Sequence, residues 1–339
     1  MTKVTAEQLP AARGCVLGLM LGDAIGAAGG NVPASGTLRA TSAGQLACFT
    51  LEGLIRADVR RAHRGIGHAP SVVWRSYHRW AMIQGISGVK PLPDEKSPSG
   101  WLSRVPVLGE RRGSAPATVA ALQRQKMGTI DKPAGTSTGA HALTRTLPVG
   151  LYPSCNPAEV AALTHTGDAR GAAWLGGTVV RLLAAGTSLP DAMESARLHA
   201  ADWVQAAERS LAPALTAARS RPRTLHELTR LATDATAVSA LAGGAYTAAS
   251  FPSRDTVREA LLFAASAGDG GHAVRVTGAL LGTLHGPDAL PVEWLSRLEL
   301  AWTADTLARD LVTQVQDNPS GGEYVEATDP NWWNRYPGG

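Results

Sequence analysis

Apolar residues recur every three to four positions along most of the chain, which is the spacing of one face of an α-helix. No run of alternating apolar and polar residues indicates a β-strand. The pattern therefore predicts an all-α protein. The predicted helices span residues 12–28, 45–64, 71–84, 115–127, 139–150, 157–164, 170–185, 190–210, 224–232, 254–267, 272–284 and 292–316.

The segments between these helices are predicted to be loops where Gly, Pro and Ser accumulate. They cover residues 31–36, 89–106, 128–138 and 318–339. The long segment 89–106 contains Trp101, which favours an ordered covering loop over a flexible linker.

The domain organisation follows from the absence of a repeat or a break in composition. We expect a single helical domain over residues 1–317 and an irregular tail over residues 318–339. The tail contains Trp332, Trp333 and Tyr336, which is too aromatic for simple disorder. It is expected to fold back onto the domain or onto a partner.

The composition narrows the class of protein. The 339 residues are 44% hydrophobic but only 5% aromatic, so a core of small side chains is expected, which lets helices approach closely. The net charge of +4 comes from scattered arginines, and a nucleic acid partner is not expected. An Ala- and Arg-rich composition favours a bacterial source by analogy alone.

The cellular location is predicted from cysteines and apolar segments. The three cysteines lie far apart, which favours a reducing, cytoplasmic setting. Residues 1–13 lack the order of a signal peptide. The apolar segments 14–30 and 172–187 contain Asp23 and Arg181 and are predicted to be buried helices, so no membrane is expected as a partner.

A glycine-spaced helix near the start carries a resemblance to a known family. Gly14, Gly18, Gly22 and Gly26 stand four residues apart, and Asp23 follows the third of them. This segment resembles the opening helix of the ADP-ribosylglycohydrolase family, which ends in Gly-Asp-Ala-Leu-Gly.

Four later segments match the same family in its order. Residues 45–57 resemble the helix after the Ser/Thr-Asp-Asp-Thr metal motif, and residues 136–150 resemble the Asn-x-Ser-x-Gly segment. Residues 163–165 match the Thr-His helix end, and residues 268–294 resemble the last metal motif with its glycine-rich helix. Together they cover roughly residues 12–300, and the chain is identified as a member of this family.

The resemblance implies a compact orthogonal helical bundle with a cleft that holds two magnesium ions. The family hydrolyses the glycosidic bond between ADP-ribose and an acceptor such as arginine or serine, and some members act on related small nucleotides. Magnesium requires oxygen ligands in near-octahedral geometry. The ion pair then orients the ribose and activates a water molecule.

The chain departs from the family at the metal motifs themselves. Thr41-Ser42-Ala43-Gly44 stands in place of Ser/Thr-Asp-Asp-Thr, and Asp269-Gly270-Gly271-His272 stands in place of Asp-x-Asp-Ser/Thr. Only Thr41 and Asp269 remain of the ligands that the resemblance implies. Because Mg²⁺ needs anionic oxygens to offset its dehydration, we predict no dinuclear magnesium site and no cofactor.

Three residues are candidates for a catalytic role, each with a structural alternative. Asp269 is a general base or a ribose ligand, or else the cap of the helix that follows. Asp23 is a retained functional carboxylate, or else a buried anchor bonded to backbone amides. His272, in the first turn of a helix, is a neutral base, or else a surface histidine.

Further residues are candidates for ligand binding by their place in the family's motifs. Arg145 is suited to bidentate contact with a phosphate, or else to an internal salt bridge. His141, His165 and His272 together with Asp269 offer imidazole and carboxylate ligands that suit zinc, but a zinc site is disfavoured because their spacing has no local ligand signature. The ligand-binding candidates are Thr41, Ser137, Gly139, His141, Arg145 and His165.

Two functional hypotheses remain open. The first is a metal-independent enzyme that acts on an ADP-ribosyl compound, a nucleotide or another small metabolite. The second is a pseudoenzyme that binds a ligand in the old cleft or a protein partner through the aromatic tail. Carboxylates and histidines converging in an open cleft would favour the enzyme, and a cleft filled by Trp101 or the tail would favour the pseudoenzyme.

Overall fold

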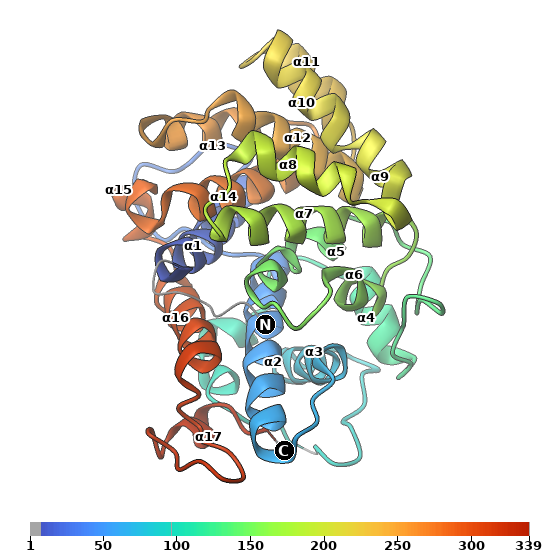
Figure 1. Cartoon of the computed structure of the whole chain (residues 1–339), viewed down its shortest axis with the longest axis vertical. Helices are drawn as coiled ribbons and strands as arrows, with labels where there is room; N and C mark the ends of the chain where they lie inside the picture. The colour runs from blue at the N-terminus through green and yellow to red at the C-terminus, as the bar shows by residue number, and fades with distance from the viewer. Residues whose placement is uncertain (1–7, 96, 339) are drawn as a thin grey trace.

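The computed structural model describes residues 8–95 and 97–338, and within them the chain is helical, with isolated bridges in place of β-strands (Figure 1). The prediction of an all-α protein is confirmed. The helices are α1 (Gln8–Ala27), α2 (Ser42–Arg64), α3 (Ala69–Ile83), α4 (Pro116–Gln123), α5 (His141–Thr144), α6 (Pro157–Ala162), α7 (Asp168–Ala184), α8 (Leu189–Leu198), α9 (Val204–Arg209), α10 (Leu211–Ser220), α11 (Leu225–Leu231), α12 (Ala237–Ser250), α13 (Val257–Ala265), α14 (His272–His285), α15 (Val292–Leu295), α16 (Ala301–Asp317) and α17 (Trp332–Arg335).

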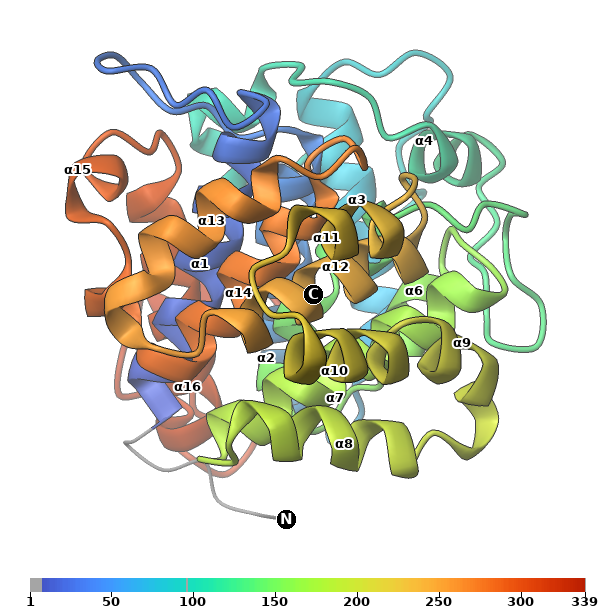
Figure 2. The ribbon, with the colours of Figure 1, turned by 90° about the horizontal axis from the view of Figure 1, so that it is seen from above.

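The glycines of α1 pack against the glycines of α14, and the two helices lie side by side in both ribbon views (Figures 1 and 2). A Cβ atom added to Gly18 would lie 2.0 Å from the carbonyl oxygen of Gly278, and one added to Gly282 would lie 2.0 Å from that of Gly14. Two helix backbones can approach this closely only where neither carries a side chain. This contact brings the C-terminal half of α1 opposite the first turn of α14.

Helix α2 extends from the centre of the molecule to one end, with α3 and α16 packed along it (Figure 1). Its N-terminus lies beside α1, where Thr41 caps the helix through a hydrogen bond from the Ala43 amide to Thr41 Oγ1. Basic residues occupy its last turn, and Gly65 ends it with a φ of 66°. Helices α8 to α11 lie at the opposite end of the molecule from α17 (Figure 1).

The aromatic tail packs against α16 and the C-terminal half of α2. Trp332 is buried and its Nε1 donates to Gln314 Oε1 at 2.7 Å, and Tyr336 is buried with its hydroxyl on Asp310. Arg56 Nε donates to the carbonyl oxygen of Pro337 at 2.8 Å. Because α2 rises about 1.5 Å per residue, Arg56 lies about 20 Å along the helix from the cap at residue 41. The tail is therefore attached far from the N-terminal end of α2.

Trp101 belongs to the same region as the tail. Its ring lies 5.4 Å from the ring of Trp302 on α16, and the guanidinium of Arg335 lies 5.8 Å from its centre. The covering loop that carries Trp101 therefore packs beside α16 and the tail.

Some predicted helices differ from those observed, for local reasons. The segment 139–150 was predicted as one helix. In the structure its α-helix ends at Thr144, and a 3₁₀ turn, Leu147–Leu151, with Pro148 as its second residue, follows. Helix α12 was not predicted, because its small and apolar residues are buried on almost every side. Such a helix has no polar face, so its sequence lacks the alternation of apolar and polar residues that marks a surface helix. Helix α10 was likewise not predicted.

Helix α1 is long and apolar enough by composition to cross a membrane. Most of its residues are buried inside the protein. The prediction about a signal peptide falls partly on residues 1–7, which lie outside the described residues.

Candidate functional site

The carboxylate of Asp23 joins the C-terminal half of α1 to the start of α2. Asp23 is fully buried, and it accepts hydrogen bonds from the Thr41 amide at 2.6 Å, the Thr41 hydroxyl at 2.7 Å and the Gly44 amide at 3.2 Å. A Cβ added to Gly44 would lie 2.6 Å from Asp23 Oδ2, so only glycine leaves room for the carboxylate. Asp23 and Thr41, both candidates from the sequence, therefore lie together.

Arg275 on α14 completes the surroundings of Asp23. Its Nε donates to Asp23 Oδ1 at 2.6 Å, and both side chains are buried. Its Nη1 lies 2.7 Å from His272 Nδ1. Sequence reasoning missed Arg275, although its position three residues after His272 places both on one face of the helix. The site thus contains a fixed, buried guanidinium that the family motifs did not indicate.

The carboxylate of Asp269 accepts hydrogen bonds from the backbone amides at the start of α14. Its oxygens accept from Gly271 at 3.0 Å, His272 at 3.1 Å and Ala273 at 2.6 Å. Gly270 and Gly271, which follow Asp269, have φ values of 74° and 78°. Glycine adopts these values without strain, and they turn the chain back toward the carboxylate. Burial raises the pKa of Asp269, and these amide hydrogen bonds oppose that shift. This geometry supports the capping role of Asp269.

Three histidines from three segments gather beside this helix end. The rings of His141 and His272 meet edge to face with centroids 5.6 Å apart. Burial and the positive charge of Arg275 lower the pKa of His141 to about 4 and that of His272 to about 3. Burial, with Arg145 and His141 nearby, lowers the pKa of His165 well below its usual value. All three imidazoles are therefore neutral at pH 7.

The hydrogen bond from Arg275 fixes the proton position on His272. A guanidinium can only donate, so Nδ1 of His272 is the acceptor and its proton sits on Nε2. An imidazole in this form presents a donor at Nε2, where a general base would need a free lone pair. The geometry therefore favours a binding role for His272 over the role of a base.

Arg145 orients His165 in a similar way. Arg145 is fully buried, and its Nη1 and Nη2 donate to the hydroxyls of Thr118 and Thr164. Thr164 Oγ1 lies 2.7 Å from His165 Nδ1 and has no other acceptor within the described residues, so it donates its hydrogen there. The proton of His165 therefore sits on Nε2.

The environment of Arg145 differs from both interpretations made from the sequence. It lies 4.7 Å from the centre of the Tyr77 ring, and no carboxylate among the described residues pairs with it. Its full burial leaves no surface for direct contact with a phosphate. Arg145 is therefore a buried positive charge that is linked to His165 through the hydroxyl of Thr164.

The segment 137–139 lies over His165. Ser137 Oγ accepts from the Gly139 amide at 3.2 Å, and both residues are half-buried. A Cβ added to Gly139 would lie 3.9 Å from His165 Nε2. Gly139 thus leaves the Nε2 side of His165 uncovered by a side chain.

The residues of this site do not fit two magnesium ions. Asp23 already accepts four hydrogen bonds, one of them from a guanidinium, and Asp269 accepts three amides. Within residues 8–95 and 97–338, no three His, Cys, Asp or Glu side chains are placed to hold a metal ion. A cation bound here would also lie beside Arg275.

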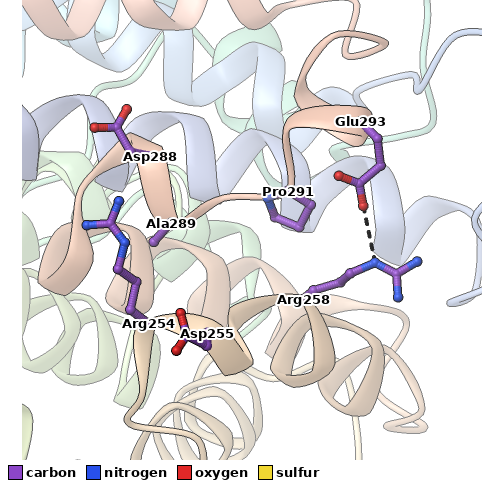
Figure 3. A pocket seen from close by; sticks show the side chains of 7 residues that line it. All are labelled: Arg254, Asp255, Arg258, Asp288, Ala289, Pro291 and Glu293. Carbon is purple, nitrogen blue, oxygen red and sulfur yellow. Dashed lines mark hydrogen bonds and ion pairs between the residues drawn. The ribbon is translucent and has the colours of Figure 1, made fainter.

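Two other hollows lie outside this site. One, of about 200 Å³, is lined by side chains of both charges from the α13 and α15 regions, and there Arg258 points to Glu293 (Figure 3). The other, of about 320 Å³, lies between α2, α16 and the tail and includes Asp58 and Tyr324. None of the predicted site residues lines either hollow.

Comparison with known proteins agrees with the helical fold. The model of the ADP-ribosylglycohydrolase family matches residues 5–321, and the chain belongs to this family. A solved structure titled "ADP-ribosylglycohydrolase-related protein complex" superposes with a TM-score of 0.60 at 21% identity, covering 92% of this chain and 100% of that one. At this identity the likeness shows the fold alone. No curated protein matches the chain.

Proposed function

We propose that this protein is a ligand-binding member of the ADP-ribosylglycohydrolase family that does not carry out the family's magnesium-dependent hydrolysis. The observation that carries the proposal is the state of the two remaining carboxylates. Asp23 is held by Arg275, Thr41 and Gly44, and Asp269 by three amides of its own helix. Neither is available as a metal ligand or as a base.

The alternative of a metal-independent hydrolase is less well supported by the same geometry. Hydrolysis of a glycosidic bond usually requires one carboxyl group to protonate the leaving group and another to activate water or attack. The protein's two candidates are engaged by its own amides and guanidinium. His272 presents a donor at Nε2 and not a lone pair. We therefore interpret Asp23, Asp269 and His272 as residues that shape the binding site.

The ligand is a small molecule, and the family relation favours an ADP-ribosyl compound or a nucleotide. The protein is proposed to act in the bacterial cytoplasm, as its composition and its cysteines indicate. Binding of a protein partner through the aromatic tail is less favoured, because Trp332 and Tyr336 are buried against the domain. We also propose that the family's metal site is degenerate in this chain and that the protein is a pseudoenzyme.

An activity assay tests this proposal. The purified protein is incubated with ADP-ribosylated arginine and serine peptides in the presence of Mg²⁺ or Mn²⁺, and released ADP-ribose is measured. We expect no release above that of a protein-free control, whereas a magnesium-dependent family member in the same buffer should cleave its own substrate. Release that is abolished by Asp269→Asn would contradict the proposal and would make Asp269 a catalytic residue.

A further inference from the structure

Two hydrogen-bond relays of the same kind meet beside His141. In the first, Arg275 Nη1 donates to His272 Nδ1, which leaves the proton on Nε2. In the second, Arg145 Nη2 donates to Thr164 Oγ1, whose hydrogen goes to His165 Nδ1, again leaving the proton on Nε2. Each relay therefore begins at a buried guanidinium and ends at an imidazole N–H.

The ends of both relays lack a partner in the protein. His272 is 8% exposed and His165 is 1% exposed, yet neither Nε2 makes a hydrogen bond within the described residues. Neither Nε2 is among the buried side-chain atoms that lack a hydrogen-bond partner, so each N–H remains accessible from outside although its ring is enclosed. These two donors point to an acceptor that the chain itself does not supply.

His141 connects the two relays in space. Its ring lies 5.6 Å from that of His272, and burial together with the charges of Arg275 and Arg145 lowers its pKa. Its Nδ1 is buried and also without a hydrogen-bond partner. Gly139, two residues before His141, faces the other imidazole, because a Cβ added to it would lie 3.9 Å from His165 Nε2. The short stretch from Gly139 to His141 therefore borders both rings.

The charges around this region favour an anion. Arg275 is paired with Asp23, but Arg145 has no acidic partner among the described residues. A guanidinium in a low-dielectric surrounding polarises the hydrogen bonds that lead away from it, so each terminal N–H becomes a stronger donor. The carboxylate of Asp269, three residues before α14, is directed at backbone amides.

We propose that the Nε2–H groups of His165 and His272 bind an anionic oxygen group, a phosphate or a carboxylate, of the ligand. This inference rests on the proposed function and names the chemical class of the ligand at that site. The family's motifs imply a site for cations. This chain instead has two imidazole N–H donors, each linked to a buried guanidinium, that suit an anion. Arg145 and Arg275 act as positioning residues, because they fix the proton on each imidazole.

Nuclear magnetic resonance of the imidazole nitrogens tests the proposal on the unmodified protein. At pH 7, His165 and His272 are expected as neutral rings protonated at Nε2. Titration with inorganic phosphate or acetate at constant ionic strength should shift these Nε2–H resonances, with chloride as the control. Phosphate and acetate in separate titrations tell which anion the site prefers. Resonances unmoved by both anions, or a proton on Nδ1 of either ring, would overturn the proposal.

A matched pair of variants tests the same inference by affinity. His272→Phe keeps an aromatic ring against His141 but removes the donor, and we expect it to weaken binding of the preferred anion about tenfold or more. His226→Phe changes an exposed histidine on α11 and should leave the affinity unchanged. Equal affinity in His272→Phe and the unmodified protein would overturn the proposal. If His272→Phe does not fold, the resonance titration decides alone.

These outcomes separate the inference from the proposed function. If ADP-ribose binds without hydrolysis while neither anion shifts the two resonances, the anion site is wrong and the binding function stands. If glycosidic bonds are cleaved, the proposed function is wrong. The resonance titration still decides the anion site in that case, because its readout does not depend on activity.

Discussion

Replacing Asp23 with alanine is expected to lower the free energy of unfolding by about 3–5 kcal/mol, because it leaves a buried guanidinium without its counter-charge. The carboxylate pairs with Arg275 at 2.6 Å, and both side chains are almost fully buried. The substitution also removes the acceptor of the Thr41 and Gly44 amides at the start of α2. Chemical denaturation followed by circular dichroism measures the loss.

Two comparisons identify the ion pair as the cause. The double variant Asp23→Ala, Arg275→Met is expected to be more stable than the sum of the two single effects, because no unpaired charge remains. In Glu293→Ala, the exposed partner of Arg258 is lost, and the cost should stay below about 1 kcal/mol. If Asp23→Ala costs no more than Glu293→Ala, the buried pair does not hold α1, α2 and α14 together.

A single methyl group added at the contact between α1 and α14 is expected to destabilise the protein. In Gly278→Ala the new Cβ would lie 2.1 Å from the carbonyl oxygen of Gly18, which is backbone and cannot rotate away. Alanine favours a helix over glycine by about 1 kcal/mol, so helix propensity alone predicts stabilisation. We expect instead a loss above about 4 kcal/mol, or no folded protein, because the helices must separate.

The control for this variant is the same substitution where space is open. A Cβ added to Gly268 would meet nothing within 4 Å, and the φ of Gly268 lies outside the left-handed region. Gly268→Ala should therefore leave the stability of the protein nearly unchanged. The midpoints of thermal unfolding compare the two variants. A Gly278→Ala protein as stable as the unmodified chain would show that the helices do not touch through their glycines.

Much of the fold could be predicted because long helices with one apolar face carry a clear period. The segments around α2, α3 and α14 were predicted within a few residues of their observed bounds. Helix α12 could not be, because a helix buried on all sides has no polar face to create a period. Helices α15 and α16 were predicted as one, and the chain between them turns where Leu38 pairs with residues 297 and 299.

The site was predictable only in part, for a physical reason. The candidates His141, His165 and His272 come from three separate segments, and no spacing in the sequence brings them together. The capping role of Asp269 was one of the two interpretations made, because it depends on nearby residues. The pair of Arg275 and Asp23 joins residues 252 positions apart, so it becomes visible only once α1 and α14 are packed.

This protein is proposed to bind its ligand without metal ions. Isothermal titration of the purified protein with ADP-ribose, in EDTA and again in Mg²⁺, tests it most directly. We expect binding with the same affinity in both buffers, because imidazole N–H groups of the protein, and not metal ions, are proposed to hold the ligand. Binding that appears only with Mg²⁺, together with two metal ions per chain by elemental analysis, would contradict it.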